Sequence, residues 1–148
     1  MWIKSIKNMP YTILAILLDR FVRNMHASLH AKSPEFDTER IGPGGSIILL
    51  TLDELGEVSM NALTQALMRD KSQMTRAVGP LERKGMLQRS QSEHDARVTI
   101  ISLTEKGQGM VKTLQSVIAE TADDVLSPLS TSDKDAFRSL LERALAKT

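Results

Sequence analysis

The chain has 148 residues, of which 41% are hydrophobic and 25% charged, and this indicates one globular domain rather than an enzyme with a separate cofactor domain. It contains no cysteine, which excludes disulfides, thiolate nucleophiles, cysteine-bound zinc and thiol-based redox sensing, and its 3% of aromatic residues are too few for a surface that stacks single-stranded nucleic acid. The net charge is +1, but the basic residues are concentrated in the centre of the chain. Residues 69–97 hold seven Lys or Arg and four Asp or Glu, whereas the segment on either side holds six Lys or Arg and seven Asp or Glu.

Residues 10–30 are predicted to form a helix with two apolar stripes, one of Leu14, Leu17, Phe21 and Met25 and one of Ile13, Leu18, Val22 and Leu29. A helix that is apolar on two faces needs more than one partner, so we expect it to lie in a subunit interface. The longest apolar run, residues 11–18, is shorter than the about 20 residues that cross a membrane, and no cleavage site follows it. We therefore expect a cytoplasmic protein without a membrane span or signal peptide.

Residues 31–46 are predicted to be a loop, because they contain two prolines and three glycines. A second helix is expected to begin near Pro43, with Gly42 as a weak cap, and to end at about Leu55. The following residues, 58–60, are long enough for only one short edge strand.

A tight connection at Met68 and Arg69 is predicted to join two helices. Asn61 is expected to cap the first of them, a short helix whose inner side chains are Leu63, Ala66 and Leu67. Asp70 is expected to cap the second, and Gln73 stands three residues later, which is the spacing of a capping box.

The second of these helices is expected to run to about Lys84, with Gly85 as its stop. Its apolar inner face consists of Met74, Ala77, Val78 and Leu81. At 100° per residue, Ser72, Arg76 and Arg83 point outward, and Gln73 and Thr75 lie on the shoulders of the same polar face.

Residues 86–89 and 98–103 are predicted to form the two strands of a hairpin, because the second strand is rich in β-branched residues and the segment between the strands is polar. Thr104 is then expected to cap a long helix that ends before Pro128, and Ser132 or Thr131 to cap a last helix. Both of these helices carry an apolar stripe and have no large sheet to cover. Packing across a two-fold axis is the simplest way to bury their stripes.

Two helices joined by a tight turn and followed by a hairpin describe a winged helix–turn–helix, so the expected fold class is mainly α (α+β). A helix fits the major groove of DNA, where Gln suits adenine, Arg suits guanine and hydroxyls suit bases or phosphates. Arg97 at the hairpin tip can enter the minor groove, with the Asp95 carboxylate holding its guanidinium. The candidate DNA-binding residues are Lys71, Ser72, Gln73, Thr75, Arg76, Arg89, Asp95 and Arg97.

Each of these signals has an ordinary structural explanation when it is taken alone. The polar helix face can be a solvated surface, and Asp and Arg are common in turns. The order of helix, turn, basic helix, hairpin and wing Arg within residues 61–103 is what favours DNA binding.

Four segments resemble the multiple antibiotic resistance regulator (MarR) family of bacterial transcription factors, and the resemblance covers nearly all of residues 10–146. They are residues 58–63 (VSMNAL), 70–76 (DKSQMTR), 81–87 (LERKGML) and 95–107, with the Asp-x-Arg wing and the Leu-Thr-x-x-Gly start of the next helix. Met68 stands where the family usually has glycine in the turn. Thr64 and the Gly44–Gly45 pair are smaller departures.

The resemblance implies one domain spanning residues 1–148, with dimerisation helices at about 1–40 and 104–148 and the winged helix–turn–helix at about 43–103. It further implies an obligate homodimer that binds double-stranded palindromic DNA. Such a protein is a repressor, or less often an activator, and a small ligand bound between the two parts of the subunit relieves its action. The sequence identifies neither the operator nor the target genes nor the effector.

Candidate effector-binding residues lie on the first helix. Phenolic and other aromatic acids are common effectors in the family, and such an anion would need Arg or His beside an apolar cleft, for example Arg20, Arg23, His26 and His30. His26 and His30 are also spaced like two metal ligands, with the carboxylates of residues 35–39 nearby, but two histidines do not make a closed site and no metal or cofactor is expected.

The alternative function is a winged-helix protein-interaction module without DNA binding. Such a module would be expected to lose the basic helix face or the wing Arg, and both are present. An enzyme is not expected, because the three histidines, His26, His30 and His94, are not part of a hydrolase or metalloprotease motif.

Overall fold

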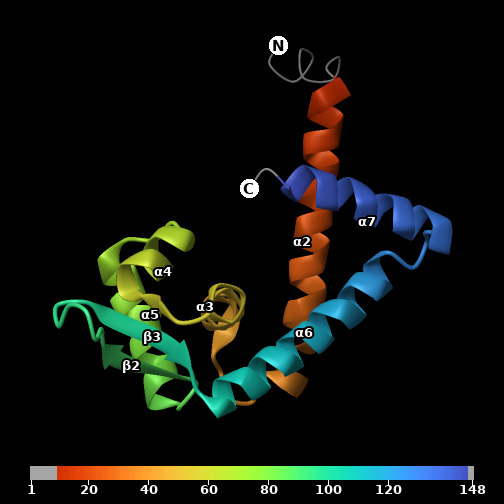
Figure 1. The fold of residues 1–148 in the computed structure, drawn as a ribbon. Coiled ribbons are helices and arrows are strands. Elements are labelled where there is room, and N and C mark those ends of the chain that lie inside the picture. The colour runs from red at the N-terminus through yellow and green to blue at the C-terminus, as the bar shows by residue number, and fades with distance from the viewer. Residues whose placement is uncertain (1–9, 147–148) are drawn as a thin grey trace, which may run out of the picture. The chain divides into compact units, whose positions relative to one another are not determined.

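The computed structural model describes residues 10–146 and is mainly helical with a small antiparallel sheet, which confirms the predicted fold class (Figure 1). In chain order the elements are α2 (Pro10–Phe36), α3 (Gly42–Leu55), β1 (Val58–Ser59), α4 (Met60–Ala66), α5 (Lys71–Arg83), β2 (Leu87–Gln91), β3 (Thr99–Leu103), α6 (Glu105–Val125) and α7 (Thr131–Leu145). None of the helices within residues 10–146 is long and apolar enough to span a membrane.

The described residues form two compact units. One unit consists of residues 33–117, and the other consists of the chain up to Lys32 together with the chain from Ile118 onward. The long helices α2 and α6 contribute to both units.

The unit of residues 33–117 is built on a three-stranded antiparallel sheet in the order β1-β3-β2. Leu87 of β2 pairs with Leu103 of β3, and Val58 of β1 pairs with Ile101 of β3. The core of this unit is fully buried and aliphatic, and includes Ile48, Leu49, Leu52, Leu63, Met74, Val78, Leu81, Met86, Leu87, Ile101 and Val111. It holds the inner face of α5 against α3, α4 and the sheet, as the spacing of Met74, Val78 and Leu81 predicts.

The other unit contains α2, α7 and the end of α6. The Phe21 ring meets the Phe137 ring edge-on at 5.8 Å between centroids, and the Lys32 ammonium lies 2.9 Å from the Asp124 carboxylate. Large apolar side chains of both outer helices stay exposed in the single chain, namely Ile13, Leu14, Ile16, Leu17, Leu18 and Val22 on α2 and Leu140, Leu141 and Leu145 on α7. So large an apolar surface on one chain is typical of an interface.

The predicted loop at residues 31–46 is mostly helical, and that prediction was wrong in extent. Helix α2 continues through Pro34 to Phe36. The Asp37 carboxylate then accepts hydrogen bonds from the Ile41 and Gly42 amides, at 2.9 Å each, and so supports the start of α3. Gly42 is the first residue of α3 rather than its cap.

Two predicted helix caps were placed at the wrong residue. Ser59, not Asn61, caps α4, because its hydroxyl accepts from the Ala62 amide at 3.0 Å. Ser130, not Thr131 or Ser132, caps α7 by accepting from the Asp133 amide at 3.1 Å. The hairpin strands also start one residue later than predicted, at Leu87 and Thr99, and the first extends to Gln91.

Candidate nucleic-acid interface

Helix α5 begins at the capping box that the sequence predicts. The Asp70 carboxylate accepts from the Gln73 amide at 2.7 Å, and the Gln73 side-chain oxygen accepts from the Asp70 amide at 3.2 Å. The box satisfies amides that the first turn of a helix otherwise leaves without partners. The first turns of α5, where its polar face lies, are therefore fixed by local bonds as well as by the core beneath them.

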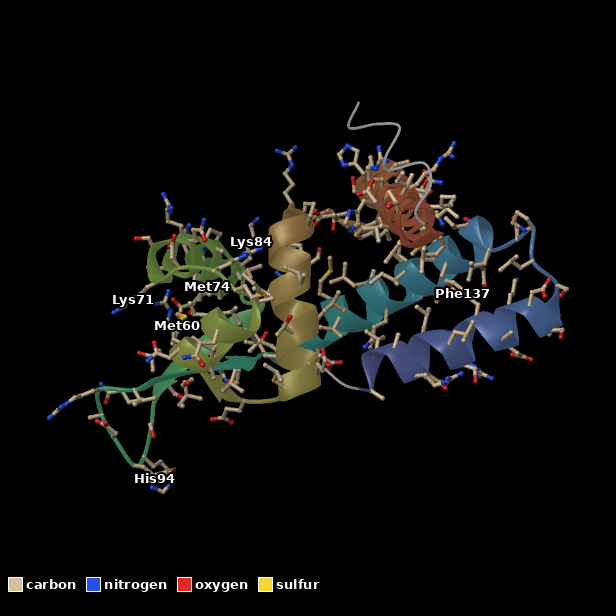
Figure 2. All side chains as sticks on the ribbon, turned by 90° about the horizontal axis from the view of Figure 1, so that it is seen from above. Met60, Lys71, Met74, Lys84, His94 and Phe137 are labelled. Atoms are coloured by element: carbon tan, nitrogen blue, oxygen red, sulfur yellow. The ribbon has the colours of Figure 1, made fainter. Side chains whose placement is uncertain are left out.

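Four side chains on these first turns form an exposed polar face. Lys71, Ser72, Thr75 and Arg76 line one shallow depression, and the Lys71 side chain points away from the core of its unit (Figure 2). The Thr75 hydroxyl donates to the Lys71 carbonyl at 2.8 Å, which leaves its oxygen lone pairs as acceptors. The face thus combines two cations with hydroxyl groups, the mixture that contacts phosphates and base edges.

Gln73 belongs both to the exposed polar face and to the capping box. Its side chain is exposed, but its oxygen is already an acceptor in the capping box. A bidentate contact to adenine needs both the oxygen and the nitrogen of the amide. In this conformation Gln73 offers its amide nitrogen and the second lone pair of its oxygen, while the cap holds that oxygen in place.

The turn before α5 has an unusual backbone at Met68. Its φ of 51° lies in the left-handed region, and its side chain is 94% exposed. The Met68 amide donates to the Gln65 carbonyl, and the Arg69 amide donates to the Thr64 carbonyl. A glycine adopts this conformation without steric cost, whereas a methionine does not. Met68 therefore adopts the left-handed conformation that this turn requires, at the cost of local backbone strain.

The tip of the β2–β3 hairpin is held by hydrogen bonds to backbone amides. The Asp95 carboxylate accepts from the Arg97 amide at 3.0 Å, and the Ser92 hydroxyl accepts from the His94 amide at 3.2 Å. The expected pair between the Asp95 carboxylate and the Arg97 guanidinium is not formed among the described residues. Asp95 instead shapes the turn, and the Arg97 side chain is exposed. His94 projects from the same hairpin tip (Figure 2).

Arg89 on β2 forms an ion pair with the recognition-helix candidate α5. Its Nε lies 3.3 Å from the Glu82 carboxylate, and both side chains are about a third to two-fifths exposed, at 34% and 40%. Sequence reasoning placed Arg89 among the DNA contacts only because of its charge. The pair instead connects the hairpin to α5, so Arg89 has a positioning contact within the protein.

The base of the hairpin is attached to the start of α6 by contacts that sequence reasoning did not foresee. The Thr104 hydroxyl donates to the Gly85 carbonyl and accepts from the Gly107 amide at 3.1 Å. A Cβ at Gly107 would lie 1.9 Å from the Met86 carbonyl oxygen, so only glycine fits there. The Leu-Thr-x-x-Gly motif at residues 103–107 is the sequence signal of this close approach.

A set of lysine contacts surrounds the same junction. Lys106 donates to the Lys84 carbonyl at 2.8 Å and pairs with Glu39 at 2.8 Å, and Lys84 donates to the Arg40 carbonyl at 3.0 Å. The last turn of α5, the start of α6 and the segment before α3 are thereby connected. No spacing in the sequence indicates these contacts, because they join residues far apart in the chain.

Comparisons with known proteins decide the family. A sequence profile of the MarR family matches residues 47–99. The regulator PecS of Dickeya dadantii is 30% identical over 133 residues, which cover 88% of this chain and 74% of PecS. The chain belongs to the MarR family.

Two further matches agree with this family. The transcriptional repressor MprA of Escherichia coli is 26% identical over 144 residues, covering 95% of this chain and 81% of MprA. The solved structure of Bordetella bronchiseptica BpsR has a TM-score of 0.70 at 18% identity, covering 88% of this chain and 97% of that one, and so shares the fold. The chain is accordingly a MarR-family transcriptional regulator and not an enzyme.

The candidate effector residues of this MarR-family chain all lie on α2. Arg20, His26 and His30 are exposed, and the Arg23 guanidinium pairs with the Asp19 carboxylate one turn earlier at 2.9 Å. Two of the carboxylates considered beside His26 and His30 have other partners, since Asp37 caps α3 and Glu39 pairs with Lys106. Within residues 10–146 no three potential metal ligands come together.

Proposed function

We propose that the protein is a homodimeric repressor that binds palindromic DNA and is released by a small aromatic acid. The observation that carries the proposal is the outward face of α5, where Lys71, Ser72, Thr75 and Arg76 project from a helix whose first turn is capped and whose other side is buried. A rigid, polar and basic helix start is what major-groove recognition requires. The name of MprA, a transcriptional repressor, supports repression rather than activation.

The hairpin supplies a second DNA contact in this proposal. The tip turn is held by Ser92 and Asp95, and Arg97 is exposed beside them. An exposed Arg on a narrow hairpin fits the minor groove, where the negative potential of A·T-rich DNA is strongest. Asp95 acts through the turn, and Arg89 through its pair with Glu82, so neither needs to contact DNA.

The dimer follows from the apolar side chains that α2 and α7 leave exposed. We assign the dimerisation part to about residues 1–40 and 104–148 and the winged helix–turn–helix to about residues 43–103. A two-fold dimer buries the same patch on both subunits and presents two copies of α5 to the two halves of a palindrome.

Relief by an aromatic acid is supported by BpsR, whose structure is described as showing how 6-hydroxynicotinic acid regulates DNA binding by that protein. In this chain four side chains of α2 are the proposed partners of such an anion: Arg20, Arg23, His26 and His30. Salicylate and 6-hydroxynicotinate are suitable first probes. If neither binds, and neither weakens DNA binding, the aromatic-acid part of the proposal fails.

Footprinting on the DNA upstream of the gene tests the proposal as a whole. We expect a protected region with two symmetric halves, and one dimer bound per region by sedimentation. At a protein concentration just sufficient for the unchanged protein to protect the site, the Arg76→Ala variant should protect it less, while the control Arg138→Ala, on α7, keeps the protection. Protection without symmetry, or protection that Arg76→Ala leaves intact, would contradict the assignment of α5.

A further inference from the structure

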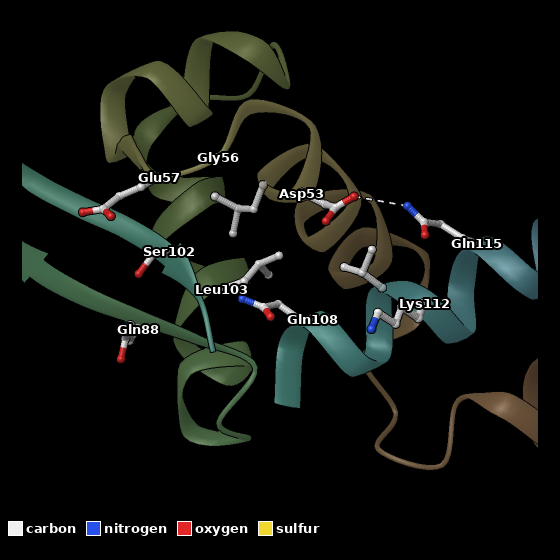
Figure 3. A pocket seen from close by; sticks show the side chains of 11 residues that line it. Asp53, Gly56, Glu57, Gln88, Ser102, Leu103, Gln108, Lys112 and Gln115 are labelled. Atoms are coloured by element: carbon white, nitrogen blue, oxygen red, sulfur yellow. Dashed lines mark hydrogen bonds between the residues drawn. The ribbon is translucent and has the colours of Figure 1, made fainter. Parts of the chain in front are cut away.

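A hollow of about 520 Å³ lies in the unit of residues 33–117 and shares no lining residue with the outward face of α5. It is bounded by the end of α3, the base of the β2–β3 hairpin and the first turns of α6 (Figure 3). Its volume is within the about 300–1,000 Å³ that small-molecule sites occupy. None of the functional groups discussed above lines it.

The inner wall of the hollow is apolar and belongs to the core. Leu52 of α3 and Val111 of α6 are only 1% and 2% exposed, and Leu103 of β3 packs against the same core. These side chains cannot move without disturbing the core, so the wall keeps its shape when the hollow is empty. Leu52 and Val111 support the wall from within the core, and the partly buried Leu103 side chain is the apolar surface that a ligand can contact.

The rim of the hollow is polar and combines both signs of charge. Gln88 and Ser102 are paired across the hairpin and project to the same side of the sheet. On α6, Gln108, Lys112 and Gln115 follow at intervals of four and three residues and therefore share one face. Donors and acceptors thus converge on the hollow from the sheet and from α6.

The two ends of the rim carry opposite charges that have no partner within the described residues. Gln115 donates to the Asp53 carboxylate at 3.1 Å, so this carboxylate is already held. Within residues 10–146, the Glu57 carboxylate and the Lys112 ammonium form neither an ion pair nor a side-chain hydrogen bond. Figure 3 shows Glu57 on the hairpin side of the hollow and Lys112 on the α6 side, clearly separated from one another.

We propose that this hollow binds a small elongated zwitterion, with an amino group at Glu57, a carboxylate at Lys112 and the Gln108 amide, and an apolar body over Leu103. A net anion would face the carboxylates of Asp53 and Glu57, and a net cation would face Lys112. Only a ligand that carries a positive and a negative group at its two ends can form ion pairs with both Glu57 and Lys112. None of the α2 residues proposed above for an aromatic acid lines this hollow.

A bound ligand would connect the end of α3 with the hairpin base and α6. The hairpin base and α6 already meet at the Thr104 and Gly107 junction. A ligand that joins them fixes the wing and so changes DNA affinity, and this consequence rests on the proposed function, whereas the binding itself does not. The change that the ligand causes in the free energy of DNA binding equals the difference between the free energies of ligand binding to the DNA-bound and the free protein.

To test the site, 6-aminohexanoate is titrated into the full chain, and binding is measured by calorimetry and by the shifts of backbone amide NMR signals. We expect saturable binding that shifts Gln88, Ser102 and Gln108, while hexanoate and hexylamine, which each lack one charged end, bind about fivefold more weakly, the upper range for an exposed ion pair. Glu57→Gln and Lys112→Met should each weaken binding by a similar factor. Glu54 is an exposed carboxylate on α3 that does not line the hollow, so the matched control Glu54→Gln should leave the affinity for 6-aminohexanoate unchanged.

Absence of saturable binding overturns the site, and so does hexanoate binding as tightly as 6-aminohexanoate or unchanged binding by both variants. Anisotropy with upstream DNA, measured with and without 6-aminohexanoate, tests the consequence separately. Ligand binding with unchanged DNA affinity overturns the coupling to the wing. A protein that binds the zwitterion but not DNA retains the site and overturns the proposed function.

Discussion

Replacing Gly107 by alanine should be among the most damaging single changes in the chain, although it adds only one methyl group. The new Cβ would lie 1.9 Å from the Met86 carbonyl oxygen and 2.9 Å from its carbonyl carbon. Real Cβ atoms essentially never come within 3.0 Å of another heavy atom, so the backbone of α6 or of the hairpin base must shift by more than an ångström. This shift would also break the hydrogen bond that the Gly107 amide donates to the Thr104 hydroxyl.

The expected loss is at least about 3 kcal/mol, the upper range for overpacking in a well-packed core, since the clash is with backbone rather than with a flexible side chain. In a chain of this size that corresponds to a fall of about 6–12 °C in the melting temperature. Gly109→Ala on the same helix is the matched control. Its Cβ would meet nothing within 4 Å, so it should stabilise the helix by about 0.5–1 kcal/mol.

Urea unfolding followed by circular dichroism measures both variants, at one fixed protomer concentration because a dimer's stability depends on concentration. The two glycines lie two residues apart on α6, so a difference in sign between their alanine variants isolates the contact with Met86. If Gly107→Ala lost less than 1 kcal/mol, the close approach of α6 to the hairpin base would be refuted.

Further predictions concern the turn, the two DNA contacts and the dimer. Met68→Gly should raise the free energy of unfolding in urea by about 0.5–1 kcal/mol, because glycine adopts the left-handed backbone without strain and the exposed Met68 side chain contributes no packing. Arg97→Ala should weaken anisotropy-measured binding to all duplexes and lower the salt slope by about 1. Arg76→Ala should change preference at one base pair by about 1–3 kcal/mol in a competition assay. Leu17→Glu should give monomers by sedimentation, because Leu17 lies in the exposed apolar stripe of α2. Unchanged behaviour in any of these assays would remove the role assigned to that residue.

The start of α5 was predictable because its determinants are local. Asp70 and Gln73 stand three residues apart, and the capping box needs no distant partner. The buried stripe of Met74, Val78 and Leu81 follows in the same way from helical periodicity. The comparison with the MarR family agrees with the order of elements that these local signals predict.

The errors lie where distant contacts decide. Ser59 and Asn61 are both good caps, and Ser59 is selected because it pairs with Ile100 of β3, far along the chain. The Arg89–Glu82 pair and the approach of Gly107 to Met86 depend on how β2 and α6 pack. No local spacing encodes such contacts.

Binding of the purified protein to its own upstream DNA and to random DNA, by fluorescence anisotropy at two salt concentrations, tests the central claim most directly. We expect tighter binding to the upstream fragment and a steep loss of affinity with salt, because Lys71, Arg76 and Arg97 displace counterions from phosphates. Equal and weak binding to both fragments at low salt would contradict it and favour a winged helix that contacts a protein.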